Sequence, residues 1–412
     1  MKLIQFRNIC IYLFLVSFFF FPRLQTIFIS VAFFITFFTG EFSNFKEAVL
    51  RNKLSMSIAI YFLITLVSLL YTSDITSGWK GIEIKFSMIA FPIFLPLIFY
   101  KSKNINRELI INVLTITAVV YAALSFSRAF YLYATLGETI NFNSVNLGFR
   151  LFQEGPFVHP TYVSIYYVIL ILIWGKRIVE GGINKRSSFW ILMLTFFFIF
   201  IFFSSSKAGV LLSVVAVISL LIYYAKKNKK IIQALFMFVF FAIIGAIGIN
   251  NSNLKTRFNT AYREMTKEYN NPVSYVQSTG ARIWVWKSTI QLIEENPIQG
   301  VGVGDIRNEL TKKYKEVGII DESILKLDSH QQYLQTTATI GIVGLISLLL
   351  VFFSLFYYSK KLNHFILFSF SLTYFLFGFT ESMFETQAGI IFFTFFSLFL
   401  VSEPQSKTEK EV

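Results

Sequence analysis

The sequence is poor in cysteine and histidine and has few acidic residues. Its one cysteine, Cys10, lies inside an apolar run, which excludes a disulfide framework and a site built from cysteine thiolates. The three histidines, His159, His330 and His364, stand on separate segments, and no acidic cluster marks a site for a divalent ion. We therefore expect neither a metal nor a cofactor.

The basic residues outnumber the acidic ones by 37 to 23, which gives a formal net charge of +14. Such a charge favours nucleic-acid binding when the basic residues gather on one soluble face. Here they form short clusters between apolar runs, the pattern of residues that orient membrane helices. We therefore expect no nucleic-acid partner.

Apolar residues, in contrast, are in large excess. They make up 55% of the chain, and the mean hydropathy is +0.62. A soluble protein of this size cannot bury that much apolar surface. Because a spanning helix needs about 20 apolar residues, the sequence predicts an all-α, polytopic membrane bundle of about 12 transmembrane helices. The expected spans are 7–21, 24–39, 55–71, 84–100, 108–133, 160–175, 188–204, 207–224, 231–249, 332–358, 363–380 and 386–402, the first two forming a hairpin about Pro22.

The distribution of Lys and Arg predicts the orientation of these spans. One set of alternate loops carries most of them, and the short loops of the other set hold only a handful: Arg23, Lys80, Arg150 and Lys207. Since the basic loops face the cytoplasm, we expect both termini to be cytoplasmic. Met1–Phe21 lacks a small-residue cleavage site and is interpreted as an uncleaved first span of an inner-membrane protein.

These patterns divide the chain into four parts. Residues 1–249 form a transmembrane bundle of about nine spans, and 250–331 form a long polar loop on the periplasmic side that contains short helices. Residues 332–402 add about three spans, and 403–412 are a cytoplasmic tail. The long loop is the natural place for a site, because binding residues concentrate on loops held by a rigid scaffold.

An amphipathic helix opens at Thr279 in this loop and stops at Asn296-Pro297. Its apolar residues recur at helical spacing, and such a helix lies on the membrane surface or caps the bundle. They are Ile283, Trp286, Ile290 and Ile293. Arg282 on this helix is either a structural arginine or a ligand for an anion.

Two further motifs follow in the loop. Gly300–Asp305 is either a nest of backbone N–H groups for an anion or a plain turn, and no βαβ unit supports a dinucleotide site. Asp328 with Gln331 is interpreted as a capping box that starts the tenth span. This places His330 in the first helical turn, where the positive end of the helix dipole favours a neutral imidazole. His330 is then either a proton acceptor or a hydrogen-bonded interfacial residue.

Lys207 opens the eighth span after three serines. A cation there opposes the helix dipole, so we expect a bound anion or a carboxylate such as Glu381 or Glu385 to compensate it. His159 precedes Pro160, which suits the first position of a helix, and we interpret His159 as structural. Lys207, Arg282 and His330 together provide two cations and a neutral base. This set suits a phosphate-bearing lipid attacked by a hydroxyl group without a metal ion.

The chain resembles the O-antigen ligase and polymerase superfamily of bacterial membrane glycosyltransferases. The specific motifs lie in residues 204–209 and 280–345. They are Gly280-x-Arg282-x-x-x-Trp286, Asn296-Pro297-x-x-Gly300-x-Gly302, and His330-Gln331-x-Tyr333-Leu334 followed by Gly341. The family usually has arginine where this chain has Lys207, and His-Asn where this chain has His330-Gln331.

The resemblance implies an undecaprenyl-diphosphate-linked glycan as donor, with lipid A–core or another glycan as acceptor outside the inner membrane. It makes Arg282 a diphosphate ligand and His330 the catalytic base. Lys207 takes a substrate-binding role with the charge retained and the bidentate fork lost. It assigns no catalytic role to His159, Asp305 or Glu381.

Several functions stay open at this point. O-antigen ligase is the leading hypothesis, and a repeat-unit polymerase or a protein O-oligosaccharyltransferase uses the same chemistry. A transporter of lipid-linked glycans predicts ionisable residues near the middle of the membrane and broken helices. We find no internal repeat and no charged span centre except Arg128. A non-catalytic scaffold of polysaccharide assembly is the remaining alternative.

Overall fold

The computed structural model describes residues 2–99, 105–136, 159–182, 185–204, 206–233 and 278–402. Within these ranges the regular structure is helical and no strand occurs, as the sequence predicts. Most of the predicted ninth span (231–249), the loop residues 250–277 and the tail 403–412 lie outside the described residues.

Six helices in the described ranges are long and apolar enough to cross a membrane. They are Lys53–Leu70, Ile75–Phe99, Arg107–Thr135, Pro160–Gly181, Lys207–Asn228 and Gln332–Lys361. Shorter apolar helices lie at Pro22–Thr36, Ser188–Phe203, Phe365–Phe377 and Gln387–Val401. The chain is thus a multi-pass membrane protein, and the predicted count of twelve and the periplasmic position of the loop stay predictions.

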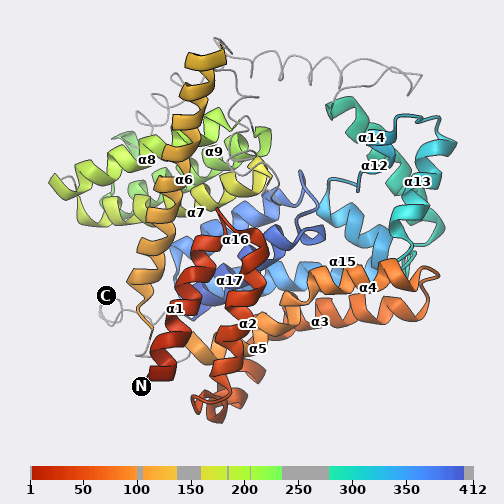
Figure 1. Ribbon diagram of the computed structural model, residues 1–412, viewed down its shortest axis with the longest axis horizontal. Helices are drawn as coiled ribbons and strands as arrows, with labels where there is room; N and C mark the ends of the chain where they lie inside the picture. Colours follow the sequence, from red (N-terminus) through yellow and green to blue (C-terminus); the bar gives the residue numbers. More distant parts are fainter. Residues whose placement is uncertain are drawn as a thin grey trace. The chain divides into compact units, whose positions relative to one another are not determined.

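The chain divides into two compact units (Figure 1). The first comprises Met1–Phe45, Leu97–Gly248 and Pro404–Val412, and the second comprises Lys46–Pro96 and Ile249–Glu403. The helices of the first unit are α1 (Lys2–Ser17), α2 (Gln25–Thr36), α6 (Arg107–Leu136), α7 (Pro160–Gly181), α8 (Lys185–Phe203) and α9 (Lys207–Asn228). Most of α5 (Ser87–Phe99) and all of α3 (Lys53–Val67), α4 (Ile75–Lys85), α12 (Ser278–Glu295), α13 (Ile306–Glu316), α14 (Glu322–Leu325), α15 (Gln332–Lys361), α16 (Phe365–Phe377) and α17 (Gln387–Val401) belong to the second.

In the first unit, α1 and α2 form the hairpin predicted about Pro22, which begins a single 3-10 turn between them. Arg7 near the start of α1 is fully buried and pairs with Glu41, which follows α2. This pair joins the ends of the hairpin that lie away from Pro22. Arg7 is therefore a buried structural arginine.

The helix α15 of the second unit is broken near its first third. Ile340 (φ −132°, ψ 22°) and Gly341 (φ 65°, ψ −168°) are not helical. In a straight helix Tyr333 and Phe352 would lie about 28 Å apart along the axis, whereas their ring centroids are 6.3 Å apart. The short helix 332–339 therefore folds back beside the longer helix 342–361. The sequence predicts one continuous span over 332–358, and this prediction is wrong because hydropathy does not detect a change of chain direction.

The loop after α12 fills the break. A broken helix leaves carbonyl and N–H groups without helical partners, and these must be satisfied inside the protein. The N–H groups of Val301 and Gly302 donate to Ala338 O (3.0 Å) and Thr339 O (2.8 Å), and Ile342 N donates to the Pro297 carbonyl (2.9 Å). The loop and the break thus form one structural unit.

The same loop is tied to the connection between α3 and α4. The Asp305 carboxylate accepts hydrogen bonds from the backbone N–H groups of Ser73 (2.6 Å) and Asp74 (2.7 Å). Gly304 N donates to the Thr72 hydroxyl (2.9 Å). A Cβ on Gly304 would lie 2.1 Å from the Asp74 carbonyl oxygen, so only glycine allows this close approach.

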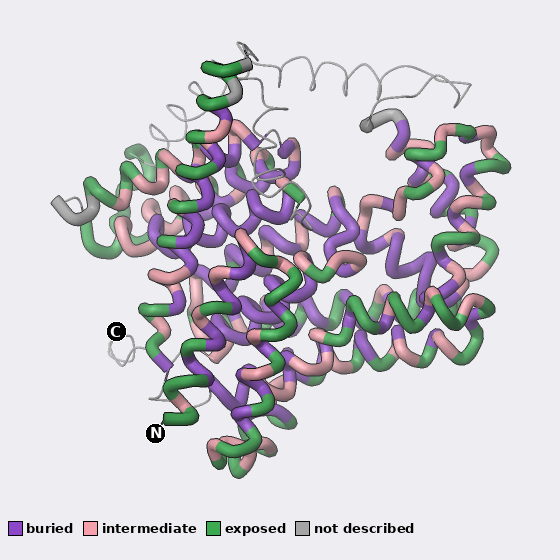
Figure 2. The backbone as a smooth tube through the Cα atoms, viewed as in Figure 1, coloured by how far each residue is buried: buried purple, intermediate pink, exposed green. Residues whose placement is uncertain are grey.

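The helix α12 packs on α13 and α15 and ends at Glu295, directly before the predicted stop at Asn296-Pro297. Its buried face differs from the predicted one. Ala281, Val285 and Leu292 are buried, together with Ser288 and Thr289, whereas Ile290 is 44% exposed. Small residues on this face let the neighbouring helices approach closely, and a search for large apolar residues misses them. Figure 2 shows the resulting change between buried and exposed positions along the helices of this unit.

Candidate functional site

Two polar side chains of the second unit, from different elements, meet at the carboxylate of a third residue. Glu381 lies in the link between α16 and α17, hereafter the α16–α17 link (378–386). Its Oε2 atom is 3.3 Å from His330 Nδ1, and its Oε1 atom is 3.1 Å from Arg282 Nη2. The structure therefore brings together the two residues for which sequence predicts a catalytic role, through a third.

His330 lies in a tight turn that precedes α15. Its backbone is left-handed (φ 47°), and its N–H donates to Asp328 Oδ1 at 2.8 Å. The helix starts at Gln332, and Gln331 caps it by accepting from Leu334 N. The predicted capping box starting at Asp328 is thus wrong, because the Asp328 carboxylate bonds the turn and not the helix. His330 stands just outside the helix and not in its first turn.

Buried groups hold this turn in place. Ser329 is fully buried, and its N–H donates to Gln335 Oε1 (3.0 Å). Its carbonyl accepts from the indole N–H of Trp286 on α12 at 2.9 Å. Trp286 therefore connects the helix that carries Arg282 to the turn that carries His330, which explains the arginine and tryptophan spacing of the motif in structural terms.

The contact with Glu381 determines what the imidazole can do. A carboxylate accepts a hydrogen bond from Nδ1–H, which leaves Nε2 unprotonated in the neutral ring. An imidazole held in this way accepts a proton at Nε2, and the carboxylate stabilises the imidazolium that forms. The His330 side chain is 26% exposed, so the imidazole is partly open to its surroundings.

Arg282 is anchored and still has donors available. Its Nη1 donates to the Thr380 carbonyl at 3.1 Å, and its Nη2 to Glu381. These two bonds use two of the five N–H groups of a guanidinium. The side chain is 31% exposed, so the remaining donors can bind a phosphate group in the fork geometry that arginine favours.

Glu381 is the residue that sequence reasoning missed. It is offered there only as a partner for Lys207, and the resemblance gives it no role. Its position is the signal that could have found it. A carboxylate in a short link between two apolar runs needs a cation or a base as its partner. Which cation or base it meets depends on long-range packing, which one sequence does not reveal.

Gln332 joins the α16–α17 link to the start of α15. It is fully buried, and its backbone N–H donates to the Gly378 carbonyl at 2.7 Å. Its side-chain oxygen accepts from Phe384 N at 2.6 Å. Both ends of the segment around Glu381 are therefore tied to a residue only two positions after His330.

The other end of the link carries a second ion pair. Glu385 Oε2 lies 2.7 Å from Lys85 Nζ on α4, and Lys85 is 2% exposed. Burial raises the pKa of the Glu385 carboxyl, and the Lys85 ammonium opposes part of this rise. The sequence predicts a span that begins at residue 84, which places Lys85 at the end of the span and not at its centre. In the structure Lys85 is the last residue of α4, inside the longer candidate span Ile75–Phe99.

Lys207 and His159 belong to the first unit. Lys207 opens α9, with Ser206 as the cap that accepts from Gly209 N at 3.0 Å. His159 caps α7 through Nδ1 and Pro160 takes the first helical position, so the structural reading of His159 is confirmed. The substrate-binding role of Lys207 stays a prediction.

Gly300–Asp305 is a loop whose backbone N–H groups bond to neighbouring segments, and it is not an anion nest. The N–H groups of Gly302, Val303 and Gly304 donate to Thr339 O, Ser68 Oγ and Thr72 Oγ1. Since a nest binds an anion through unoccupied N–H groups, these donors are already used. In the described ranges, no group of three or more His, Cys, Asp or Glu side chains is arranged to hold a metal ion.

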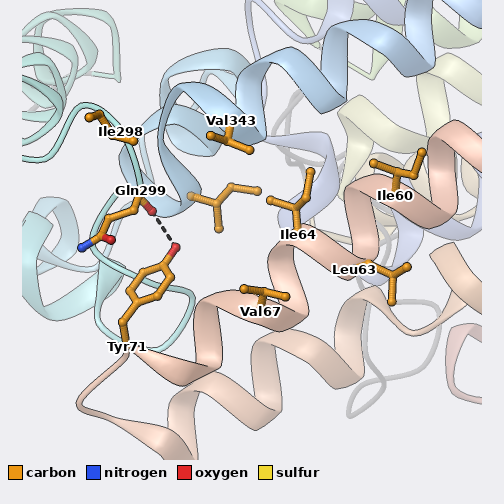
Figure 3. Close-up of a pocket in the computed structure, with 9 residues that line it drawn as sticks. Ile60, Leu63, Ile64, Val67, Tyr71, Ile298, Gln299 and Val343 are labelled. Atoms are coloured by element: carbon orange, nitrogen blue, oxygen red, sulfur yellow. Dashed lines mark hydrogen bonds between the residues drawn. The ribbon is translucent and has the colours of Figure 1, made fainter.

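An aliphatic groove of about 370 Å³ lies beside the break in α15 (Figure 3). Its walls come from α3, from α15 and from the loop after α12, and Tyr71 donates to the Gln299 carbonyl at one end (2.6 Å). The other residues that line it are Ile60, Leu63, Ile64, Val67, Ile298, Ile340 and Val343. No acid or base lines the groove, so it suits a hydrocarbon chain and takes no part in proton transfer.

His330, its carboxylate partner Glu381 and Arg282 lie together in one unit of a helical chain, and the apolar helices define the class of the protein: a multi-pass membrane protein. A family model described as O-antigen ligase matches residues 190–349. This match confirms the resemblance to the O-antigen ligase superfamily and points to a membrane enzyme that transfers glycans. Arg282 and His330 lie within the matched residues, whereas Lys85, Glu381 and Glu385 lie outside them.

The chain is also similar to an uncharacterized protein of Haemophilus influenzae. The two are 29% identical over 143 residues, which cover 33% of this chain and 34% of the relative. The chain thus matches about a third of the length of this relative.

Proposed function

We propose that this protein is a membrane glycosyltransferase that moves a glycan from an undecaprenyl-diphosphate carrier to an acceptor hydroxyl on the periplasmic side. The acceptor we favour is lipid A–core, which makes the protein an O-antigen ligase. The observation that carries the proposal is the Glu381 carboxylate shared by His330 and Arg282. The carboxylate holds the proposed base, His330, beside the proposed phosphate ligand, Arg282, in a chain similar to O-antigen ligases.

The proposed reaction is a single displacement. His330 Nε2 takes the proton of the acceptor hydroxyl while the hydroxyl oxygen forms a bond to the anomeric carbon of the donor. The bond between that carbon and the diphosphate oxygen breaks, and its electron pair leaves with the undecaprenyl diphosphate. Arg282 stabilises the charge that grows on the diphosphate, and Glu381 stabilises the imidazolium. Lys207 is proposed as a further ligand of the anionic donor. No step uses a metal ion or a cofactor.

A transporter of lipid-linked glycans is the alternative from another class. It predicts an ionisable residue inside a span and a broken helix, and Lys85 and the break in α15 fulfil both. Each feature has a local explanation in this chain. Lys85 pairs with Glu385, and the loop after α12 satisfies the break. The enzyme proposal accounts in addition for the base beside the arginine.

The test compares His330→Ala and Arg282→Ala with wild type at matched expression, followed by gels of the surface glycan. Two variants serve as controls: Lys326→Ala removes an exposed cation of the same loop, and His364→Asn replaces the histidine that caps α16. Both site variants are expected to lose the surface glycan, and both controls to keep it.

The material left on the lipid carrier identifies the acceptor reaction. Full-length glycan on the carrier indicates a ligase, and single repeat units indicate a polymerase. Loss of glycan from a surface protein alone indicates a protein O-oligosaccharyltransferase. Unchanged glycan profiles in both site variants contradict the enzyme proposal and favour a transporter or scaffold.

A further inference from the structure

Lys85 is a cation in a place that disfavours charge. It is the last residue of α4, inside the candidate span Ile75–Phe99 and directly before the apolar helix α5. Its side chain is almost fully buried. Charged residues inside membrane spans are costly to keep, and they commonly serve a function together with a named partner. The partner here is Glu385.

Glu385 ends a single 3-10 turn, Met383–Glu385, just before α17. Its side chain is 22% exposed, and the neighbouring Met383 and Phe384 are fully buried. The ion pair thus holds a mostly buried link and not a solvent-exposed turn.

The link carries two carboxylates four residues apart, Glu381 and Glu385. Lys85 neutralises the second, so the first is left to Arg282 and His330. Without the ammonium, the link carries two carboxylates, one buried and one partly buried, and Arg282 is the one cation paired with either of them in the described residues. Because a buried carboxylate without a partner is strongly disfavoured, the link then has to move or take up a proton.

We propose that Lys85 and Glu385 are a positioning pair for the transfer reaction. Their contact fixes the α16–α17 link at one point, and Gln332 fixes it at two others, Gly378 O and Phe384 N. Glu381 is thereby held against His330 Nδ1 and Arg282 Nη2. The proposal rests on the proposed function, since its purpose is to keep His330 Nε2 available as the base. Lys85 itself touches neither substrate nor base.

The test reads the imidazole directly by ¹⁵N NMR, which distinguishes the two neutral tautomers of histidine. His159→Asn and His364→Asn leave His330 as the one imidazole in the chain, and asparagine is itself a good helix cap. In this background Lys85→Met, Glu385→Gln and the conservative Lys85→Arg are compared. Lys80→Met is the matched control, because Lys80 lies on the same helix with an exposed side chain.

Lys85→Met and Glu385→Gln are each expected to shift the His330 signal from the single Nδ1–H tautomer to a mixture. Each is also expected to lower the turnover number for transfer at least tenfold with an unchanged KM for the donor. Lys85→Arg and Lys80→Met are expected to keep the wild-type signal and turnover. If Lys85→Met does not fold, Glu385→Gln, which keeps the shape of the side chain, carries the test.

Wild-type tautomer signal and turnover in folded Lys85→Met or Glu385→Gln protein would overturn the proposal. So would a loss of thermal stability that the double variant restores while signal and turnover never change, since that pattern belongs to a purely structural pair. Failure of the proposed function gives a different result. In that case wild type transfers no glycan from a lipid diphosphate donor, and the NMR signal still responds to Lys85.

Discussion

Replacing His330 with glutamine is expected to lower the turnover number for glycan transfer by about 10²–10⁴-fold, the range that one general base contributes. Glutamine keeps a polar side chain of similar reach and cannot take the proton of an acceptor hydroxyl at neutral pH. The measurement is the rate of transfer by purified protein in liposomes at saturating donor. The variant is expected to keep the KM for the donor, because Arg282 and not His330 binds the diphosphate.

The second variant tests whether Glu381 acts through His330. Glu381→Gln alone is expected to lower the turnover number by about 10–100-fold, the usual cost of losing the partner that orients an imidazole. Added to His330→Gln, it is expected to cause little further loss, since residues that act as a unit are not additive. Full additivity of the two losses would show that Glu381 acts through something other than His330.

Gly341→Ala is expected to destabilise the fold by about 3 kcal/mol or more, in the range of the largest single-residue effects. Two causes add at this position. The backbone (φ 65°, ψ −168°) lies in a region that essentially only glycine adopts, which costs another residue about 1–3 kcal/mol. A Cβ would also lie 1.9 Å from the Ile298 carbonyl oxygen, and a backbone atom cannot easily give way. The measurement is the free energy of unfolding in detergent.

Gly40→Ala is the comparison for a left-handed glycine in open space. Gly40 has φ 74° and ψ 3°, and an added Cβ meets nothing within 4 Å. It is therefore expected to cost only the backbone term of about 1–2 kcal/mol. Equal losses in the two variants would mean that the loop after α12 yields readily, and that the break in α15 is not held as tightly as the contacts indicate.

Local rules predicted several parts of the structure correctly. Pro160 after His159 starts α7, Ser206 before Lys207 starts α9, and Asn296-Pro297 ends α12. These features depend on residues close in sequence, whose capping chemistry is the same in any fold. Short motifs also single out Arg282 and His330, which the structure places on one carboxylate, and the catalytic roles of the two residues stay predictions.

The features that sequence did not predict depend on distant contacts. The break at Ile340 and Gly341 has no signal in a hydropathy count, which joins residues 332–339 to the apolar run that follows them. Glu381 and Lys85 have no local pattern that assigns their partners, which lie 51 and 300 residues away. The same holds for Gly300–Asp305, where the choice between nest and turn depended on which acceptors the rest of the fold supplies.

The most direct test of the account measures both products of the transfer at once. Purified protein in liposomes receives a synthetic glycan on undecaprenyl diphosphate and a lipid A–core acceptor, with a chelator present to remove divalent ions. We expect wild type to release one undecaprenyl diphosphate for each glycan joined to the acceptor. We expect His330→Gln to form both products far more slowly than wild type. Equal product formation by wild type and His330→Gln, or glycan crossing the membrane with no bond to the carrier broken, would contradict the account.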